Sequence, residues 1–150
     1  MTALAVPDVR LRDSLLDTMT DFGEVTEMHG SGFWHLGEGW PDTSEDGVPE
    51  QVIGFLAIRH TLNDFLLEIG GHIGFSVRPA RRGEGHASRA LALALDRAAE
   101  LGVEQALVTC DLDNEPSRRT IVRNGGVFED ERKGKKRYWI DTADRGHAVR

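Results

Sequence analysis

The sequence contains very little of several residues that build particular classes of protein. Cys110 is the only cysteine among 150 residues, so an intrachain disulfide is impossible and a cysteine-based zinc site is not expected. No apolar run approaches the roughly 18 residues of a membrane span. The first residues also lack the basic and apolar segments of a secretory signal. We therefore expect no metal site, no membrane association and a cytoplasmic protein, since a reducing compartment is the default for such a chain.

Positive charge is scarce overall and unevenly distributed. The chain has 18 Lys and Arg against 25 Asp and Glu, a net charge of -7, which argues against a nucleic-acid partner. Residues 1–77 carry three arginines against 13 acidic residues, whereas residues 78–137 carry 13 basic residues against ten acidic ones. A cleft between these parts could hold a cationic and an anionic ligand together. A solvated surface of uneven charge explains the same counts.

The hydrophobic pattern predicts one α/β or α+β domain over residues 1–150, because the length allows one sizeable core. The strongest helix prediction is 86–101, where apolar residues recur at helical spacing and Gly102 follows as a stop signal. Thr61 is expected to cap a short helix. The predicted elements are, in order, a helix over about 7–22, a mobile loop over 30–50, a strand covered on both faces over 51–58, a helix over 61–69, a strand over 72–77, a helix over 86–101, a strand over 105–109, a helix from Asn114 to Asn124, a hairpin of 127–129 with 137–140, and a tail over 141–150.

A glycine-rich turn between the strand 72–77 and the long helix favours binding of a diphosphate. Gly83 and Gly85 have no β-carbon to keep an anion from the free amides at the start of the helix. Three arginines add positive charge to this turn: Arg78, Arg81 and Arg82. A triphosphate loop would need a Lys-Ser/Thr pair where this chain has His86-Ala87.

Two motifs in this part of the chain resemble those of the GCN5-related N-acetyltransferase (GNAT) superfamily, in a poorly characterised bacterial branch. The turn fits the acetyl-CoA motif as Arg82-x-x-Gly85-x-Ala87, after Val-Arg-Pro at the end of a strand. Asn114-x-x-Ser117, followed by two glycines, is similar to the next motif of the family. The resemblance covers residues 51–140.

The resemblance implies a mixed, mostly antiparallel twisted sheet with flanking helices and a V-shaped splay between its two central strands. It also implies acetyl-CoA as cosubstrate, with pantetheine in the splay, and direct transfer of acetyl to an amine. The implied cofactor contacts are Phe75, Ser76 and Val77 for pantetheine, Arg82, Gly83, Gly85, His86 and Ala87 for the pyrophosphate, and Asn114 and Ser117 beside the pantetheine arm.

The catalytic residues are harder to predict. His72, at the start of the splayed strand, is the candidate general base, although a histidine there could instead fix the neighbouring turn by hydrogen bonding to backbone. Many family members carry a tyrosine seven positions after the motif asparagine to protonate the leaving thiolate, and here that position is Ile121. Tyr138, the only tyrosine, is expected to pack beside Trp139.

In the family the region equivalent to residues 30–50 forms part of the acceptor site, and here it has loop composition where related chains carry an early strand. The acidic first half favours a cationic acceptor such as a polyamine, an amino sugar or a lysine side chain. An acyl-CoA-binding sensor without turnover, or a nucleotide-binding protein, are the alternatives. The family often forms dimers, so a homodimer is possible.

Overall fold

Two antiparallel sheets form the framework of the protein. The computed structural model describes residues 4, 12–22 and 52–145. One sheet pairs β1 (Gly54–Ile58) with β2 (Ile73–Val77), and the other has the order β3-β5-β4, from β3 (Gln105–Asp111), β4 (Val127–Arg132) and β5 (Lys135–Asp141). The helical elements are α1 (Arg12–Phe22), the π-helix η4 (Leu66–Gly70), the 3-10 helix η5 (Pro79–Arg81), α2 (His86–Glu100) and α3 (Glu115–Arg123).

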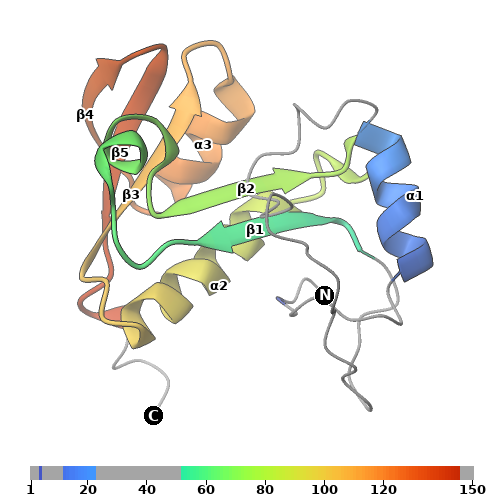
Figure 1. Ribbon diagram of the computed structural model, residues 1–150, viewed down its shortest axis with the longest axis horizontal. Coiled ribbons are helices and arrows are strands. Elements are labelled where there is room, and N and C mark those ends of the chain that lie inside the picture. The colour runs from blue at the N-terminus through green and yellow to red at the C-terminus, as the bar shows by residue number, and fades with distance from the viewer. Residues whose placement is uncertain (1–3, 5–11, 23–51, 146–150) are drawn as a thin grey trace.

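Helix α2 joins the two sheets into one core. Its stripe of Leu91, Ala94, Leu95 and Ala98 is fully buried, and the same cluster includes Ile73 of β2. It also takes in apolar residues of the second sheet, namely Ala106, Val108, Tyr138 and Ile140. Figure 1 shows α2 lying beneath β1 and β2, with α1 at the end of these strands that is remote from β3. The long helix predicted from the sequence is therefore the element on which the whole fold packs.

The order and type of elements after residue 52 confirm the sequence prediction, with differences at their ends. Strand β1 begins at Gly54, and all five of its residues are half-buried, so both faces are covered but neither is fully buried. Strand β3 continues two residues beyond the predicted end, to Asp111. The predicted loop 30–50, the start of the first helix and residues 146–150 lie outside the described residues. Among the described helices, none has the length and apolar character needed to cross a membrane.

The short element after β1 differs from its prediction. Thr61 does not begin it; instead the Asn63 side chain accepts a hydrogen bond of 2.8 Å from the Leu66 amide. The Gly71 amide then donates to the Leu66 carbonyl at 2.6 Å, a bond between residues five apart that makes this turn a π-helix. Gly71 can close the turn because its φ of 68° is readily available to glycine.

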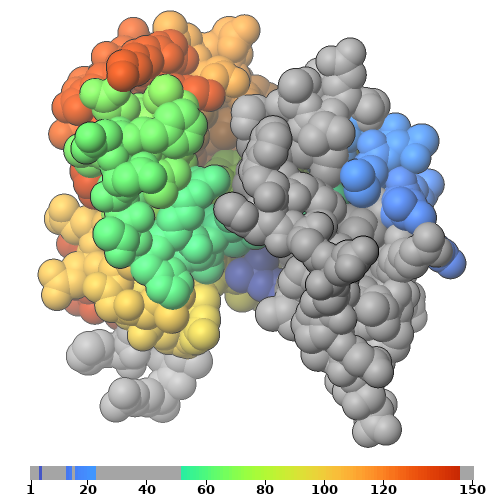
Figure 2. Space-filling model, viewed as in Figure 1, coloured from blue at the N-terminus to red at the C-terminus, as the bar shows by residue number. Residues whose placement is uncertain are grey.

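Hydrogen bonds and one ion pair hold η4 against the β4–β5 hairpin, and Figure 2 shows the two segments in contact. Arg137, which is 1% exposed, donates to the Leu67 carbonyl at 2.8 and 3.1 Å and also pairs with Glu129 and Asp130. Glu68 pairs with Lys133 in the hairpin turn. These contacts fix the segment that leads into β2.

Candidate functional site

The two sheets meet at a single corner and then diverge. The His72 amide donates to the Leu107 carbonyl at 2.7 Å, and the Leu107 amide donates to Nδ1 of His72 at 2.8 Å. Beyond this corner β2 and β3 belong to different sheets, and Figure 1 shows them running apart. The structure therefore contains the V-shaped splay that the family resemblance implies, with His72 at its apex.

Gly71 lets the strands approach at this apex. A β-carbon on Gly71 would lie 2.5 Å from the Leu107 carbonyl oxygen, a distance that no real side chain tolerates. The Thr109 hydroxyl donates to the Ile69 carbonyl at 2.5 Å on the same side. The apex is thus closed by backbone contacts and two side chains, and the opening lies toward the other end of β2.

The predicted pantetheine residues Phe75, Ser76 and Val77 lie on β2, in the diverging arm of the V. One edge of β2 pairs with β1, from Gly54 opposite Val77 to Ile58 opposite Ile73, so the other edge faces the opening. Arg82 donates through Nε to the Val77 carbonyl at 2.9 Å. This bond ties the turn that follows to the end of β2.

The glycine-rich turn has the backbone conformation that its composition predicts. Gly83 and Gly85 have φ values of 78° and 85°, in the left-handed region that favours glycine, and a β-carbon at either position would meet no atom of the described residues within 4 Å. Gly85 is the N-cap of α2, and no side chain caps this helix. Among the described residues, the amides of Gly83, Gly85 and Ala87 have no hydrogen-bond acceptor. Free amides at the start of a 15-residue helix, beside open space, form a site suited to an anion.

Arg78 does not contribute charge to this turn, contrary to the sequence prediction. It is 6% exposed, and its guanidinium donates to Asp17 at 2.8 Å, Asp21 at 2.9 Å and the Thr18 hydroxyl at 3.2 Å. The hydrogen bond from Arg78 lowers the pKa of Asp21. Arg78 instead anchors α1 to the end of β2, because two carboxylates on α1 offset its charge.

The other two arginines stay at the turn. Arg81 pairs through Nε with Glu84 at 2.7 Å and lowers the pKa of that carboxyl; the Nε2 atom of His86 lies 3.3 Å from the same oxygen. The Arg82 guanidinium lies 5.8 Å from the centre of the Phe22 ring. The turn therefore presents amides and two exposed or half-buried guanidiniums, with one carboxylate between them.

Helix α3 begins as the Asn-x-x-Ser motif predicts. The Asn114 side chain accepts a hydrogen bond from the Ser117 amide at 3.2 Å, and Pro116 occupies the first turn. At the other end, Asn124 donates to the Ser88 carbonyl and hydroxyl, both at 3.2 Å. This bond fixes α3 beside the first turn of α2, a contact that sequence reasoning missed because only the fold brings the two residues together.

The ring of His72 is buried and engaged. His72 is 8% exposed at the apex of the V. This burial lowers the pKa of its ring below the ordinary value of 6.5. Trp139 lies against it edge-on, with ring centres 6.3 Å apart. Because Nδ1 accepts the Leu107 amide, a neutral ring carries its proton on Nε2. Leu107 is the partner that no sequence pattern could have indicated.

Three side chains near β3 and β5 complete the surroundings. Ile121 is fully buried in the core, and Cys110 is 5% exposed with a pKa raised by burial. Tyr138 does pack in the hairpin, but against Phe128, with ring centres 5.6 Å apart, and not beside Trp139. The reason is that neighbouring residues of a strand face opposite sides of the sheet.

Comparisons with known proteins place this arrangement in a family. The family described as "Acetyltransferase (GNAT) domain" matches residues 8–127. A comparison with curated protein sequences gives no match. Among solved structures, yncA from Salmonella typhimurium, a putative acetyltransferase with its cofactor acetyl-CoA, aligns with a TM-score of 0.51 and 17% identity over 67% of this chain and 62% of its own.

A second structure is RimJ of Mycobacterium smegmatis in complex with CoA-disulfide, with a TM-score of 0.42 and 26% identity over 51% of this chain and 45% of its own. Each alignment covers less than two thirds of the length of the solved structure. The likeness to yncA shows the fold, and the family match spans most of the sequence. The chain therefore belongs to the GNAT acetyltransferase family.

Proposed function

We propose that this protein is an acetyl-CoA-dependent N-acetyltransferase that transfers acetyl directly to an amine. The observation that carries the proposal is the turn at Gly83 and Gly85, which presents free amides at the start of α2 where the V of β2 and β3 opens. Acetyl-CoA is the family's acyl donor, and its pyrophosphate and extended pantetheine arm match this combination of anion site and open strand edge.

In this proposal the turn binds the pyrophosphate. Gly83, Gly85, His86 and Ala87 supply backbone amides, and Arg82 adds positive charge while it holds the Val77 carbonyl. Dipole and amides act together, because both favour negative charge at a helix N-terminus. The open space around both glycine α-carbons leaves room for the phosphate oxygens.

The pantetheine arm would lie along β2, against Phe75, Ser76 and Val77. Asn114 and Ser117, at the start of α3, would border it on the other side. The side-chain oxygen of Asn114 is used in the cap, so its amide group is the part available to a ligand. Holding the thioester in the V would supply most of the catalysis, through positioning of the reacting atoms.

The reaction balances without a covalent enzyme intermediate. A neutral amine attacks the thioester carbonyl carbon, the C–N bond forms, the C–S bond breaks, and the thiolate takes a proton from solvent. A base must first remove a proton from the ammonium form of the acceptor. His72 is the candidate base, acting directly or through water. To accept a proton, the neutral ring must either release the Leu107 amide from Nδ1 or first give up the proton that Nε2 carries.

The acceptor is proposed to be a cationic amine on a small molecule or peptide, because residues 1–77 carry a strong excess of acidic side chains. A cytoplasmic location, a single domain over residues 1–150 and a homodimer belong to the same proposal. None of them is needed for the cofactor site described above.

A catalytically weak acyl-CoA-binding protein is the second candidate. One observation favours it: Ile121, where many relatives carry a tyrosine that protonates the thiolate, is buried in the core and has no polar atom in its side chain. Release of free thiol from acetyl-CoA over a panel of amines separates the two candidates, since only the enzyme gives amine-dependent release.

The cofactor site is tested by Gly85→Glu, with Gly102→Glu as its matched control. Both glycines flank α2 at nearly equal φ, 85° and 86°, and none of the residues that the structure describes would lie within 4 Å of an added β-carbon, so the backbone strain of substitution is similar. We expect Gly85→Glu to weaken acetyl-CoA binding by at least about tenfold through bulk and charge repulsion, while Gly102→Glu leaves affinity unchanged. Equal affinities in a calorimetric titration would refute the assignment of the turn.

The catalytic role of His72 is tested by its pH–rate profile. If His72 is the base, His72→Asn removes the limb of the pH–rate profile near neutral pH. It also lowers kcat, while KM changes little. Asparagine can still accept the Leu107 amide, so the apex is kept. An unaltered profile would leave His72 with its structural role at the apex alone.

A further inference from the structure

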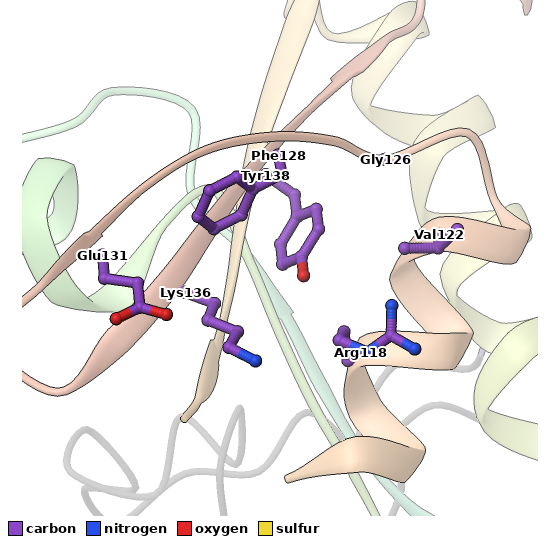
Figure 3. Close-up of a pocket in the computed structure, with 7 residues that line it drawn as sticks. All are labelled: Arg118, Val122, Gly126, Phe128, Glu131, Lys136 and Tyr138. Atoms are coloured by element: carbon purple, nitrogen blue, oxygen red, sulfur yellow. The ribbon is translucent and has the colours of Figure 1, made fainter. Parts of the chain in front are cut away.

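A pocket of about 470 Å³ lies outside the V, between α3 and the β4–β5 hairpin. Figure 3 shows its walls, which come from both elements. The lining residues are Arg118 and Val122 of α3, Gly126 of the connection, and Phe128, Glu131, Lys136 and Tyr138 of the hairpin. A volume in this range accommodates a small organic molecule.

The pocket shares no lining residue with the proposed cofactor site, although Arg118 directly follows Ser117 on α3. Helix α3 turns one side, with Ile121 and Asn124, toward the core and α2. Arg118 and Val122 lie on a different side of the same helix and line the pocket. Figure 3 accordingly shows α2 and the pocket on opposite sides of α3.

Two opposite charges face the pocket without pairing. Glu131 and Lys136 lie directly opposite each other on β4 and β5, yet among the described residues neither side chain forms an ion pair or a hydrogen bond, and Glu131 is exposed. The other two lysines of the chain are both paired, Lys133 with Glu68 and Lys135 with Asp111. Lys136 is half-buried, so its ammonium gains from an acceptor inside the pocket.

Two further polar groups are held in place between the charges and α3. The Tyr138 side chain is 4% exposed, and its hydroxyl points toward Arg118 in Figure 3. Glu115 holds the Arg118 guanidinium in a bidentate pair of 2.5 and 2.8 Å. Arg118 is therefore preorganised, with most of its charge already offset.

The remaining wall is apolar and open to solvent. Phe128 is 52% exposed and Val122 is 44% exposed, so both present apolar surface to solvent. The Phe128 ring is supported by Tyr138. An apolar group placed between Phe128 and Val122 would remove both from water.

We propose that this pocket binds a free α-amino acid with an apolar side chain. Lys136, aided by the Tyr138 hydroxyl, binds the carboxylate, Glu131 binds the ammonium, and Phe128 with Val122 contacts the side chain. A zwitterion satisfies both unpaired charges at once, whereas a simple anion leaves Glu131 as a repulsive neighbour. The proposal assigns a second ligand to the protein and does not depend on acetyl transfer.

The test uses three probes that differ by one charged group, titrated calorimetrically into the full chain without acetyl-CoA. They are L-leucine, isocaproate, which lacks the ammonium, and isoamylamine, which lacks the carboxylate. We expect L-leucine to bind more tightly than either analogue by roughly ten- to hundredfold, the value of one charge-assisted hydrogen bond. In a further titration, acetyl-CoA should bind with the same affinity in the presence and in the absence of L-leucine.

Variants assign each contact. Glu131→Gln should weaken L-leucine and isoamylamine roughly tenfold or more. It should not weaken isocaproate, which gains from the loss of a repulsive carboxylate. Lys136→Gln should weaken L-leucine and isocaproate but not isoamylamine, for the same reason with the charges reversed. Arg123→Gln is the matched control, because Arg123 is an exposed cation of α3 outside the pocket. Circular dichroism confirms that each variant is folded.

The outcomes separate this inference from the proposed function. Absence of L-leucine binding, or binding that all three variants weaken equally, overturns the amino-acid site. Isocaproate that binds as tightly as L-leucine overturns the role of Glu131 and leaves a simple anion site. If the unaltered protein does not bind acetyl-CoA, only the proposed acetyltransferase activity is contradicted.

Discussion

The side chain of His72, at the apex of the V, contributes to stability in a way that depends on pH. His72 accepts the Leu107 amide, and burial lowers its pKa below 6.5. Between the lowered pKa and about 6.5 the unfolded chain binds more protons at this position than the folded chain does. The free energy of unfolding contributed by His72 therefore falls as the pH drops below about 6.5, and it is fully present above that pH.

We predict that His72→Asn removes this part of the pH dependence. The asparagine side-chain oxygen replaces Nδ1 as acceptor but does not titrate, whereas His72→Ala leaves the buried Leu107 amide unpaired at a cost of about 1–3 kcal/mol. Urea unfolding at a series of pH values from 5 to 8, a range of about three units around the histidine pKa, measures both effects. His60→Asn, at an exposed histidine, is the control. An identical slope in His72→Asn and the unaltered protein would contradict the assignment.

At the scale of elements, the start of α3 combines a cap with a proposed ligand contact. Asn114 accepts the Ser117 amide through its oxygen, and its amide nitrogen is the group proposed to meet pantetheine. We predict that Asn114→Ala lowers the free energy of unfolding by about 1 kcal/mol, because the cap is lost. Asn114→Asp keeps the capping oxygen and therefore keeps most of the stability.

The same pair of variants distinguishes the two roles of Asn114. If the amide nitrogen contacts the ligand, Asn114→Asp restores stability but not the affinity for acetyl-CoA, measured by calorimetry. If Asn114 only caps the helix, the aspartate variant restores both quantities. The second result would remove Asn114 from the proposed cofactor site and leave the turn at Gly85 unaffected.

At this scale, the features that could be predicted from the sequence are those that depend on residues close together in the chain. The stripe on α2, the Asn114 cap and the glycine turn all depend on spacings within a few residues, and the structure has each of them. Strand ends and the π-helix η4 were mispredicted, because the bond from Gly71 to Leu66 depends on how Gly71 meets β3. The propensities of Thr61 and Asn63 as caps are too similar to decide which one begins the turn.

The tasks of charged and polar side chains were predicted less well, for a related reason. Arg78 was expected at the ligand site because it lies beside the turn in sequence, but its acceptors lie on α1, about 60 residues earlier in the chain. The partner of His72 lies 35 residues away. A pattern of residue types cannot supply such partners, since they depend on which elements pack together.

At the scale of the whole molecule, helix α2 and the His72–Leu107 corner fix how the two sheets lie relative to each other. The core on α2 reaches both sheets, and the His72–Leu107 corner fixes where they separate. A ligand in the V would therefore contact one arm from each sheet without a change in the packing between them. Its effect on backbone protection should be confined to the segments that line the opening.

Hydrogen exchange with and without acetyl-CoA tests this arrangement. We predict slower exchange in residues 73–88, where free amides of the turn gain phosphate acceptors, and no change in residues 127–141 of the hairpin. In Gly85→Glu the protection of residues 73–88 should disappear, while Gly102→Glu should retain it. Protection spread evenly over both sheets would mean that acetyl-CoA stabilises the fold as a whole, and protection of the hairpin alone would place the ligand at the α3 pocket instead of the V.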